Sequence, residues 1–171
     1  MSTNPSSNPS TTPEPALWGQ LEDEAPELAA AVAARLTATK HHVLATLRQD
    51  GSPRVSGTEV QLRGPELTIG SMPGAVKARD LQRDPRFALH ANPGDGSMEG
   101  GDAKVAGRAV EVTDEAELDA FRAEVETPPG PMHLFRLLLS EVVLTSLHPD
   151  GDRLVIETWR PGAGVHRVER Y

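Results

Sequence analysis

The first half of the chain contains three short apolar runs separated by turn sequences of only a few residues. The runs are HHVLATLRQ, RVSGTEVQL and ELTIGS, and the turns between them are DGSP and RGPE. Parallel strands need a crossover of a dozen or more residues, so connections this short allow only antiparallel pairing. This part of the chain therefore predicts an antiparallel β-meander.

Four later runs predict further strands. They are RFALHA, DAKVAGRAVEVT, HLFRLLLSEVVLTSLH and RLVIETWR, the last two joined by a PDGD turn. Gly107 within the second of these runs indicates a bulge or a close approach of another backbone. About seven strands with local pairing favour a mainly β fold, a closed antiparallel barrel with helices at its edges.

Three segments predict the peripheral helices. One begins at Pro26, with apolar residues every four positions, and ends near TATKHH. VKARDLQRD predicts a second helix, which Pro85 closes. Asp114 and Glu117 form a capping box for a third helix that buries an apolar face.

Composition limits the class of protein. Residues 1–15 are rich in Ser, Thr, Asn and Pro and predict a disordered tail, so residues 16–171 are expected to form one domain. A net charge of −8 argues against a nucleic-acid partner. No apolar run has the length of a membrane span, no signal-peptide pattern is present, and the chain has no Cys. We therefore expect a cytoplasmic protein without a membrane partner, and no metal-ligand spacing is seen.

The stretch GSMPGAVKARDLQRDPR departs from the acidic balance of the chain, since it carries four cations within 17 residues. A strand ends at Ser71, a glycine turn follows, and a helix begins near Ala75. The first amides of a helix lack internal partners, and the helix dipole favours an anion there, so Lys77 and Ser71 predict a phosphate site. The alternative is a solvated helix face whose cations pair with Asp80 and Asp84.

The run from His41 to Val112 resembles the flavin-binding split β-barrel family, whose best-known member is pyridoxamine 5′-phosphate oxidase. The motifs that carry the resemblance are VLATLRQDGSPRVSGTEV, LTIGSMPGAVKARDLQRDPRFALH and DAKVAGRAVEVTD. The later segment IETWRPGAGVHRVER is similar to the closing strand of the family. The resemblance implies a split β-barrel, a bound FMN or deazaflavin (coenzyme F420), and a homodimer with two cofactors at its interface.

The resemblance also implies roles for individual residues. The cofactor phosphate would meet Gly70, Ser71 and Lys77, and the flat ring would lie along Ser56, Gly57 and Thr58. The partner chain would contribute from the fifth and last strands, which makes Lys104 and Trp159 candidates. For Trp159 the alternative is packing in the core or at the dimer interface.

Several positions differ from the oxidase pattern. Ser56, Gln61 and Val76 stand where that pattern has cations, and Arg167 is followed by Val168 and Glu169 rather than by the Arg-x-His motif. The pattern is nearer to the reductases of the family that act on a small organic substrate. The alternative function is a non-catalytic barrel that binds flavin or haem.

No side chain is predicted to act as a nucleophile or base, because the cofactor would carry the hydride chemistry. His90 is the one candidate for a proton donor, against an ordinary hydrogen-bonded strand histidine.

Overall fold

The computed structural model describes residues 14–94, 97–127 and 129–171. The predicted tail at residues 1–15 lies outside the described residues except for Glu14 and Pro15, which have no regular structure. In chain order the elements are α1 (Trp18–Glu24), α2 (Pro26–Thr37), β1 (His42–Leu47), β2 (Pro53–Thr58), β3 (Gln61–Arg63), β4 (Glu66–Ser71), α3 (Val76–Arg83), β5 (Arg86–His90), β6 (Asp102–Val112), α4 (Glu115–Glu124), β7 (His133–Leu147), β8 (Leu154–Arg160) and β9 (Gly164–Arg170).

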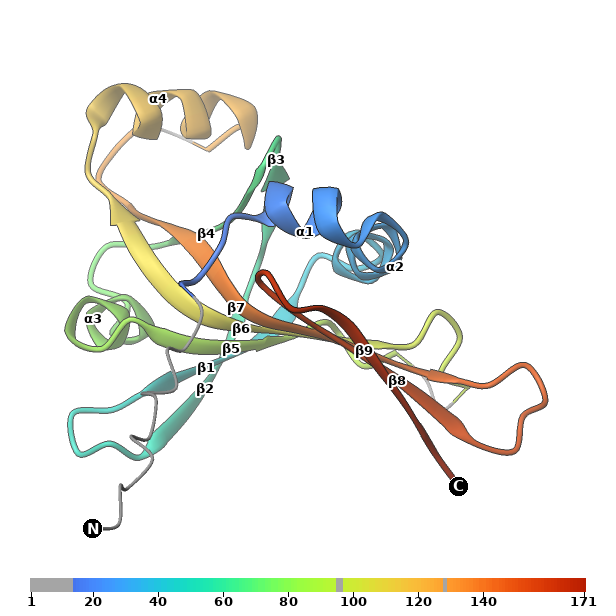
Figure 1. Cartoon of the computed structure of the whole chain (residues 1–171). Helices are drawn as coiled ribbons and strands as arrows, with labels where there is room; N and C mark the ends of the chain where they lie inside the picture. The colour runs from blue at the N-terminus through green and yellow to red at the C-terminus, as the bar shows by residue number, and fades with distance from the viewer. Residues whose placement is uncertain (1–13, 95–96, 128) are drawn as a thin grey trace, which may run out of the picture.

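The strands form one antiparallel sheet with the order β2-β1-β5-β6-β7-β4-β3. β7 is long enough to serve two neighbours on one edge, because its first half pairs with β4 and its second half with β8. β8 and β9 therefore extend away from the curled part of the sheet (Figure 1). β2 returns to lie against β4, which gives the split β-barrel that the sequence predicts.

Gly107 lies at a register shift between β6 and β7, as predicted. A Cβ atom at this position would stand 1.8 Å from the carbonyl oxygen of Leu138, so no other residue fits without moving the backbone. The shift bends the two longest strands and helps the sheet to curl around its core.

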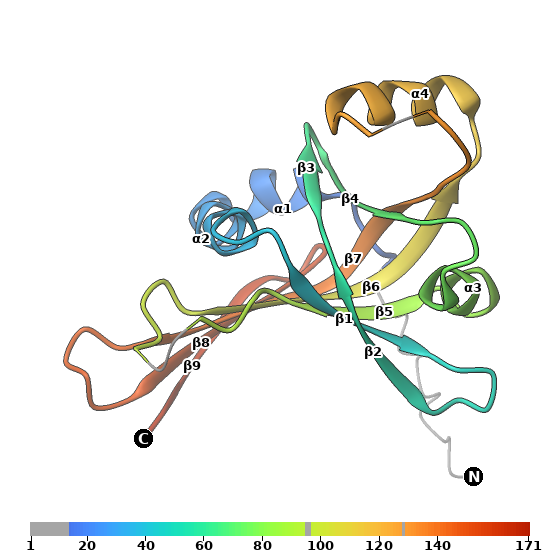
Figure 2. The same ribbon diagram turned by 180° about the vertical axis from the view of Figure 1, so that it is seen from behind.

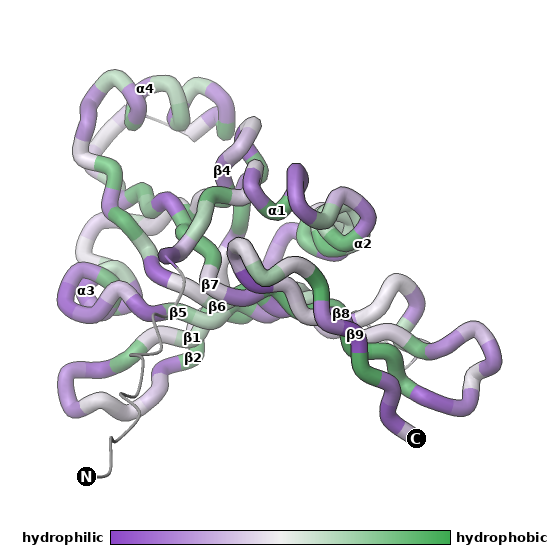
Figure 3. The backbone as a smooth tube through the Cα atoms, viewed as in Figure 1, coloured by the Kyte–Doolittle hydropathy of each residue, from purple (hydrophilic) through white to green (hydrophobic). Residues whose placement is uncertain are grey.

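The core lies between the concave side of the sheet and helices α1 and α2. Trp18 and Leu21 of α1 and Leu28 and Val32 of α2 are buried there, beside Trp159 of β8. Figure 3 shows the result as hydrophobic colour along α2 and the central strands, whereas α3 is largely hydrophilic. A second, smaller cluster joins α4 to the start of β7 and the end of β6.

Three predictions need correction. The run RVSGTEVQL is two strands rather than one, because the chain leaves the sheet at Glu59 and Val60 between β2 and β3. Helix α1 is not predicted by the periodicity, since it has only seven residues and depends on the burial of Trp18. The segment Gly164–Arg170 forms a strand of its own, β9, which the strand prediction leaves out.

The other helix predictions are confirmed. α2 begins at Pro26 and α3 ends directly before Asp84 and Pro85. Asp114 caps α4 by accepting a hydrogen bond from the Glu117 amide at 2.9 Å. The reciprocal half of the capping box is absent from the described contacts, because the Glu117 carboxylate instead accepts from Arg136.

Candidate functional site

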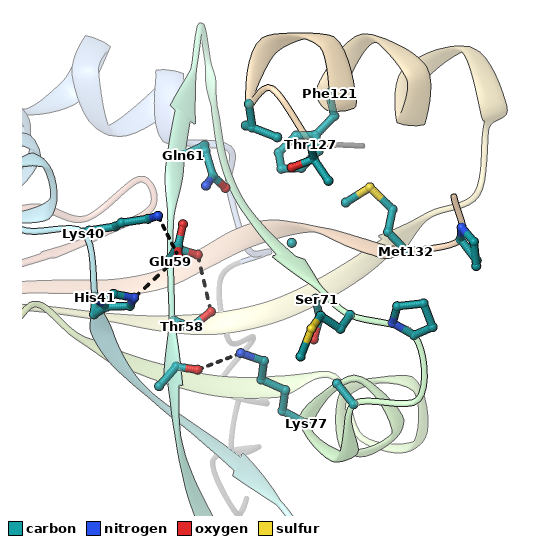
Figure 4. Close-up of a pocket in the computed structure, with 17 residues that line it drawn as sticks. Lys40, His41, Thr58, Glu59, Gln61, Ser71, Lys77, Phe121, Thr127 and Met132 are labelled. Carbon is teal, nitrogen blue, oxygen red and sulfur yellow. Dashed lines mark hydrogen bonds and ion pairs between the residues drawn. The ribbon is translucent and has the colours of Figure 1, made fainter. Parts of the chain in front are cut away.

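A cleft of about 640 Å³ opens where β2 and β3 face β4 and the start of α3, with α4 above it (Figure 4). Figure 2 shows the backbone of these elements from behind, with α4 above α3. Its size is within the usual range for a small-molecule site. The lining residues come from segments far apart in the chain: Lys40, His41, Gly57, Thr58, Glu59, Gln61, Gly70, Ser71, Met72, Pro73, Ala75, Lys77, Phe121, Val125, Thr127, Pro131 and Met132.

Lys77 enters the cleft from the first turn of α3. Its Nζ donates a hydrogen bond to the Gly57 carbonyl oxygen of β2 at 2.7 Å, so the side chain crosses from one wall to the other. Burial lowers the pKa of Lys77, while the nearby Glu59 carboxylate acts in the opposite direction. Ala75 at the helix N-cap supplies no side-chain acceptor to the first turn. The amides at the start of α3 and the Lys77 ammonium therefore offer positive charge on the same side of the cleft.

Ser71 ends β4 directly before the glycine turn. Its Oγ is buried, and among the described residues it has no hydrogen-bond partner. A buried hydroxyl without a partner is costly in a native structure, so such a group in a cleft indicates a ligand or a water as its partner. Gly70 precedes it, and an added Cβ there would be 3.4 Å from the Phe121 ring.

A carboxylate balances the cations at the mouth of the cleft. Glu59 lies 3.5 Å from both Lys40 Nζ and His41 Nε2, as the dashed lines in Figure 4 show. Lys40 and His41 are largely exposed and Glu59 is partly exposed, so these pairs contribute little to stability. Their consequence is electrostatic: the cleft contains two lysines, a histidine and one carboxylate in a chain whose net charge is −8.

A buried carboxylate holds α3 in place. Asp80 is 2% exposed and accepts hydrogen bonds from Thr46 Oγ1 at 2.9 Å, Arg54 Nε at 2.6 Å and Arg83 at 3.0 Å. Burial alone would raise the pKa of Asp80, but the three hydrogen bonds outweigh it and lower the pKa below its ordinary value. Arg83 also donates to the Leu47 carbonyl oxygen. This network ties α3 to β1 and β2 and so places Lys77 opposite Gly57.

Five of the eight predicted cofactor residues line the cleft: Gly57, Thr58, Gly70, Ser71 and Lys77. Ser56 is adjacent on β2 but does not line it.

The remaining two candidates lie elsewhere. Lys104 is exposed on β6, and strand pairing places it in one row across the sheet with His90, Val43 and Gly57. Trp159 is wholly buried, and its indole N–H donates to Glu24 of α1 at 2.9 Å. The ring of His90, the proton-donor candidate, lies 2.5 Å from the Ala91 carbonyl oxygen and is outside the cleft.

Apart from Gly57 and Thr58, the cleft residues outside the strand–turn–helix motif were not predicted as site residues from the sequence. Lys40, His41 and Glu59 carry no recognisable spacing, and Phe121 and Met132 were visible only as apolar residues near a predicted helix. The alternative predicted a solvated α3 face whose cations pair with Asp80 and Asp84, but Asp80 is buried rather than solvated. Arg83 pairs with Asp80, and Arg86 beyond the helix pairs with Asp84 at 2.6 Å.

One group in the described part of the chain has the geometry of a metal site. His148, Asp150 and Asp152 place ligand atoms within 4.8 Å of one another at the turn between β7 and β8. The Arg153 guanidinium lies among them, 2.6 Å from Asp152 and 2.8 Å from His148 Nε2. Arg153 already neutralises these carboxylates, so the cluster does not need a metal ion for charge balance.

A family model described as pyridoxamine 5′-phosphate oxidase matches residues 28–146, which is more than half of the chain. The chain belongs to the pyridoxamine 5′-phosphate oxidase family. No curated protein matches the sequence. No helix among the described residues is long and apolar enough to cross a lipid bilayer.

Solved structures share the fold of this family member. A pyridoxamine 5′-phosphate oxidase-related, FMN-binding protein from Nostoc punctiforme PCC 73102 is 14% identical, with 86% of this chain and 96% of that chain covered and a TM-score of 0.61. PhzG from Burkholderia lata 383, in complex with tetrahydrophenazine-1-carboxylic acid, is 18% identical, with 97% and 98% covered and a TM-score of 0.56. A heme-binding protein from Mycobacterium smegmatis is 21% identical, with 81% and 57% covered and a TM-score of 0.51.

Proposed function

We propose that this protein is an oxidoreductase that uses a bound flavin or deazaflavin, FMN or coenzyme F420, to transfer hydride to a small organic substrate. The observation that supports this most strongly is the junction of β4 and α3. There the Ser71 hydroxyl has no partner among the described residues, and the Lys77 ammonium and uncapped helix amides lie beside it. These donors suit the phosphate of such a cofactor.

The residues around the junction would position the rest of the cofactor. Gly57 presents only backbone on its face of β2, and an added Cβ there would meet nothing within 4 Å, so a flat ring can approach closely. Ser56 and Thr58 flank it on the same strand. When bound, the cofactor supplies the hydride chemistry, and the chain supplies binding and orientation. The proposal therefore assigns no side chain a covalent or acid–base role.

The substrate in this proposal is not pyridoxamine phosphate. Binding the substrate phosphate needs further cations, and Arg167 is followed by Val168 and Glu169 instead of the Arg-x-His motif that holds that phosphate in the oxidase. Gln61 and Val76, which stand where the oxidase pattern has cations around the FMN phosphate, are uncharged as well. Each missing charged hydrogen bond removes about 1.5–3 kcal/mol of favourable binding free energy.

We also propose that the protein is a homodimer whose partner chain completes the cofactor site through Lys104. The outer face of the barrel supports this, because it exposes Val43 at 38%, Val55 at 70% and Val110 at 44%. These side chains lie on β1, β2 and β6 of the same sheet, where a partner chain would cover them. Trp159 would act only through core packing, since it is wholly buried in its own chain.

A second candidate function uses the same cleft for binding without catalysis. The protein would then be a non-catalytic binder of flavin or haem. The observation that favours haem is His41, which lines the cleft with an exposed imidazole and could ligate iron.

The test of the main proposal is a set of titrations of wild type, Lys77→Ala and Arg79→Ala with FMN, coenzyme F420 and haemin. Arg79 lies on the same helix and carries the same charge, but it is exposed and does not line the cleft. Lys77→Ala should weaken flavin or deazaflavin binding about ten- to a hundredfold, and Arg79→Ala less than threefold. Equal effects of the two variants would refute the phosphate role of Lys77.

The other outcomes separate the remaining alternatives. Absence of flavin and deazaflavin binding, with a Soret band on addition of haemin that His41→Ala removes, would establish the haem-binding function. Light scattering at micromolar concentration tests the dimer. A monomer that still binds its cofactor would contradict the role of Lys104 from a partner chain.

A further inference from the structure

The two ends of the cleft differ in chemical character (Figure 4). The charged side chains that line the cleft lie toward β2 and the start of α3: Lys40, His41, Glu59 and Lys77. The opposite end, beneath α4, is lined mainly by apolar side chains, with one amide and one hydroxyl: Phe121, Val125, Met132, Gln61 and Thr127. One ligand that fills both ends must therefore be charged at one end and apolar at the other.

The apolar end is built from well-packed side chains. Phe121 is 2% exposed and belongs to a small cluster against which Val125 and Met132 pack. Gly70 forms the adjoining wall, because a Cβ there would lie 3.4 Å from the Phe121 ring and 3.5 Å from the Met132 methyl carbon. Even an alanine at this position would narrow the space.

The cation that lies against the Phe121 ring is already engaged. The Arg63 guanidinium lies 5.3 Å from the centroid of the Phe121 ring and 2.6 Å from the Glu124 carboxylate. Arg63 is not among the residues that line the cleft. A carboxylate or phosphate beneath α4 would thus lose its hydration without gaining a free cation, which is strongly unfavourable.

Among the described residues, the α4 end has two polar side chains, Gln61 and the exposed Thr127, and only the Gln61 amide is buried there without a partner. Its Oε1 is buried, and the described part of the chain offers it no hydrogen-bond partner. The side chain projects from β3 toward the space below α4 (Figure 4). The two ends of an amide are assigned from their surroundings, so this atom is either an acceptor or a donor in search of a partner. A hydroxyl group can satisfy it in both cases.

We propose that the α4 end of the cleft is the subsite for an uncharged, apolar part of the substrate, an aryl or alkyl group whose hydroxyl or amide bonds to Gln61. That the ligand is a substrate rests on the proposed function, whereas the preference for an uncharged apolar group rests on the lining residues themselves. The subsite selects against substrates that carry an anionic group at this position.

Two methionines allow the two ends to be observed separately. Met132 lines the α4 end and Met72 follows Ser71 at the other end, and the whole chain has four methionines. In protein labelled at the methionine methyl carbon, NMR titration would use phenol, toluene and inorganic phosphate as probes. Met132→Leu and Met72→Leu would assign the two signals. Phenol and toluene differ only in the hydroxyl that Gln61 would bind.

The expected result is that phenol and toluene shift the Met132 signal and leave Met72 in place. Gln61→Leu should weaken the binding of phenol about fivefold and change the binding of toluene less than twofold, because only phenol loses a hydrogen bond. Gln61→Met, which matches the length of the side chain, should behave in the same way if Gln61→Leu perturbs the fold.

Three results would overturn the proposal: a phenol shift at Met72 alone, no shift by phenol at either methionine, or equal weakening of phenol and toluene by both Gln61 variants. Phosphate tests the proposed function independently, since it should shift Met72 and not Met132. Phosphate binding without phenol binding would thus refute the subsite alone, and phenol binding without phosphate or flavin binding would refute the proposed function alone.

Discussion

Helices α3 and α4 border the same cleft but are attached to the barrel in different ways. α3 buries Ala78 and Leu81 in the main core and adds the buried Asp80, which binds two arginines and a threonine of the barrel and helix. α4 packs in the smaller cluster instead. Its outer contacts are ion pairs whose carboxylates, Glu117 and Glu124, are both 50% exposed.

The difference agrees with what each end of the cleft would do. A phosphate site needs donors held in one geometry, and the network around Asp80 gives α3 that rigidity. A subsite for an apolar group needs only a matching apolar surface. Because α4 has few contacts with the rest of the barrel, this wall can adjust to groups of different shape. Figure 1 shows α4 standing away from the main body of the molecule, in line with its separate cluster. We expect α4 to open locally at a lower free energy than α3.

The largest effect is expected at Asp80. Asp80→Ala leaves Arg54 and Arg83 without their buried partner and should lower the free energy of unfolding by about 3–5 kcal/mol. Thr46→Val removes one hydrogen bond, from an uncharged hydroxyl to the same carboxylate, and leaves both ion pairs, so it should cost less, about 1.5–3 kcal/mol. Urea denaturation followed by circular dichroism measures both. Similar losses in the two variants would show that the charge of Asp80 is unimportant.

Phe121→Ala tests the independence of α4. Removing a buried Phe costs about 3–5 kcal/mol when the whole protein depends on it. Because α4 belongs to a separate cluster, we expect less than half of this loss in global stability, together with loss of hydrogen-exchange protection confined to residues 115–127. A full loss in the global transition would mean that α4 and the barrel unfold as one unit.

The pH dependence of stability should come in part from Asp80. Its pKa is lower in the folded protein than the ordinary value of 3.8, so its contribution is complete above about pH 5 and is lost as the pH falls through the folded pKa. The difference in unfolding free energy between wild type and Asp80→Asn should therefore shrink below pH 4. Urea denaturation between pH 3 and pH 7 measures it, and a difference that grows on acidification contradicts the assignment.

The smallest effect is expected at Glu124. Glu124→Gln removes the ion pair with Arg63, but a half-exposed pair contributes only about 0–1 kcal/mol. Thermal unfolding in low and high salt should show a small destabilisation that salt abolishes. A loss comparable to that of Asp80→Ala would overturn the contrast between the two helices.

Local patterns predicted most of the fold. The turn sequences and the capping residue Asp114 act over a few positions, so they can be recognised without knowledge of the rest of the chain. The break at Glu59 between β2 and β3 depends instead on where β4 and β7 lie. Strand β9 is largely polar and exposed, so no apolar alternation marks it.

The same limit applies to the candidate site, where the residues of one local motif could be predicted and those brought together by the fold could not. Gly70, Ser71 and Lys77 belong to one continuous motif, and Gly57 and Thr58 followed from the family resemblance. Gln61 and Phe121 meet only because β3 and α4 approach each other in space, 60 residues apart in the sequence. A pattern search along the chain has no means of joining them.

The bond between Trp159 and Glu24 has a practical consequence for spectroscopy. The chain has two tryptophans, and both are buried. The Trp18 indole N–H donates to Glu22 within α1, and the Trp159 indole N–H joins β8 to Glu24 of α1. Neither lines the cleft. Intrinsic emission will thus follow the separation of α1 from β8 on denaturation, while occupancy of the ligand site must be followed by another signal.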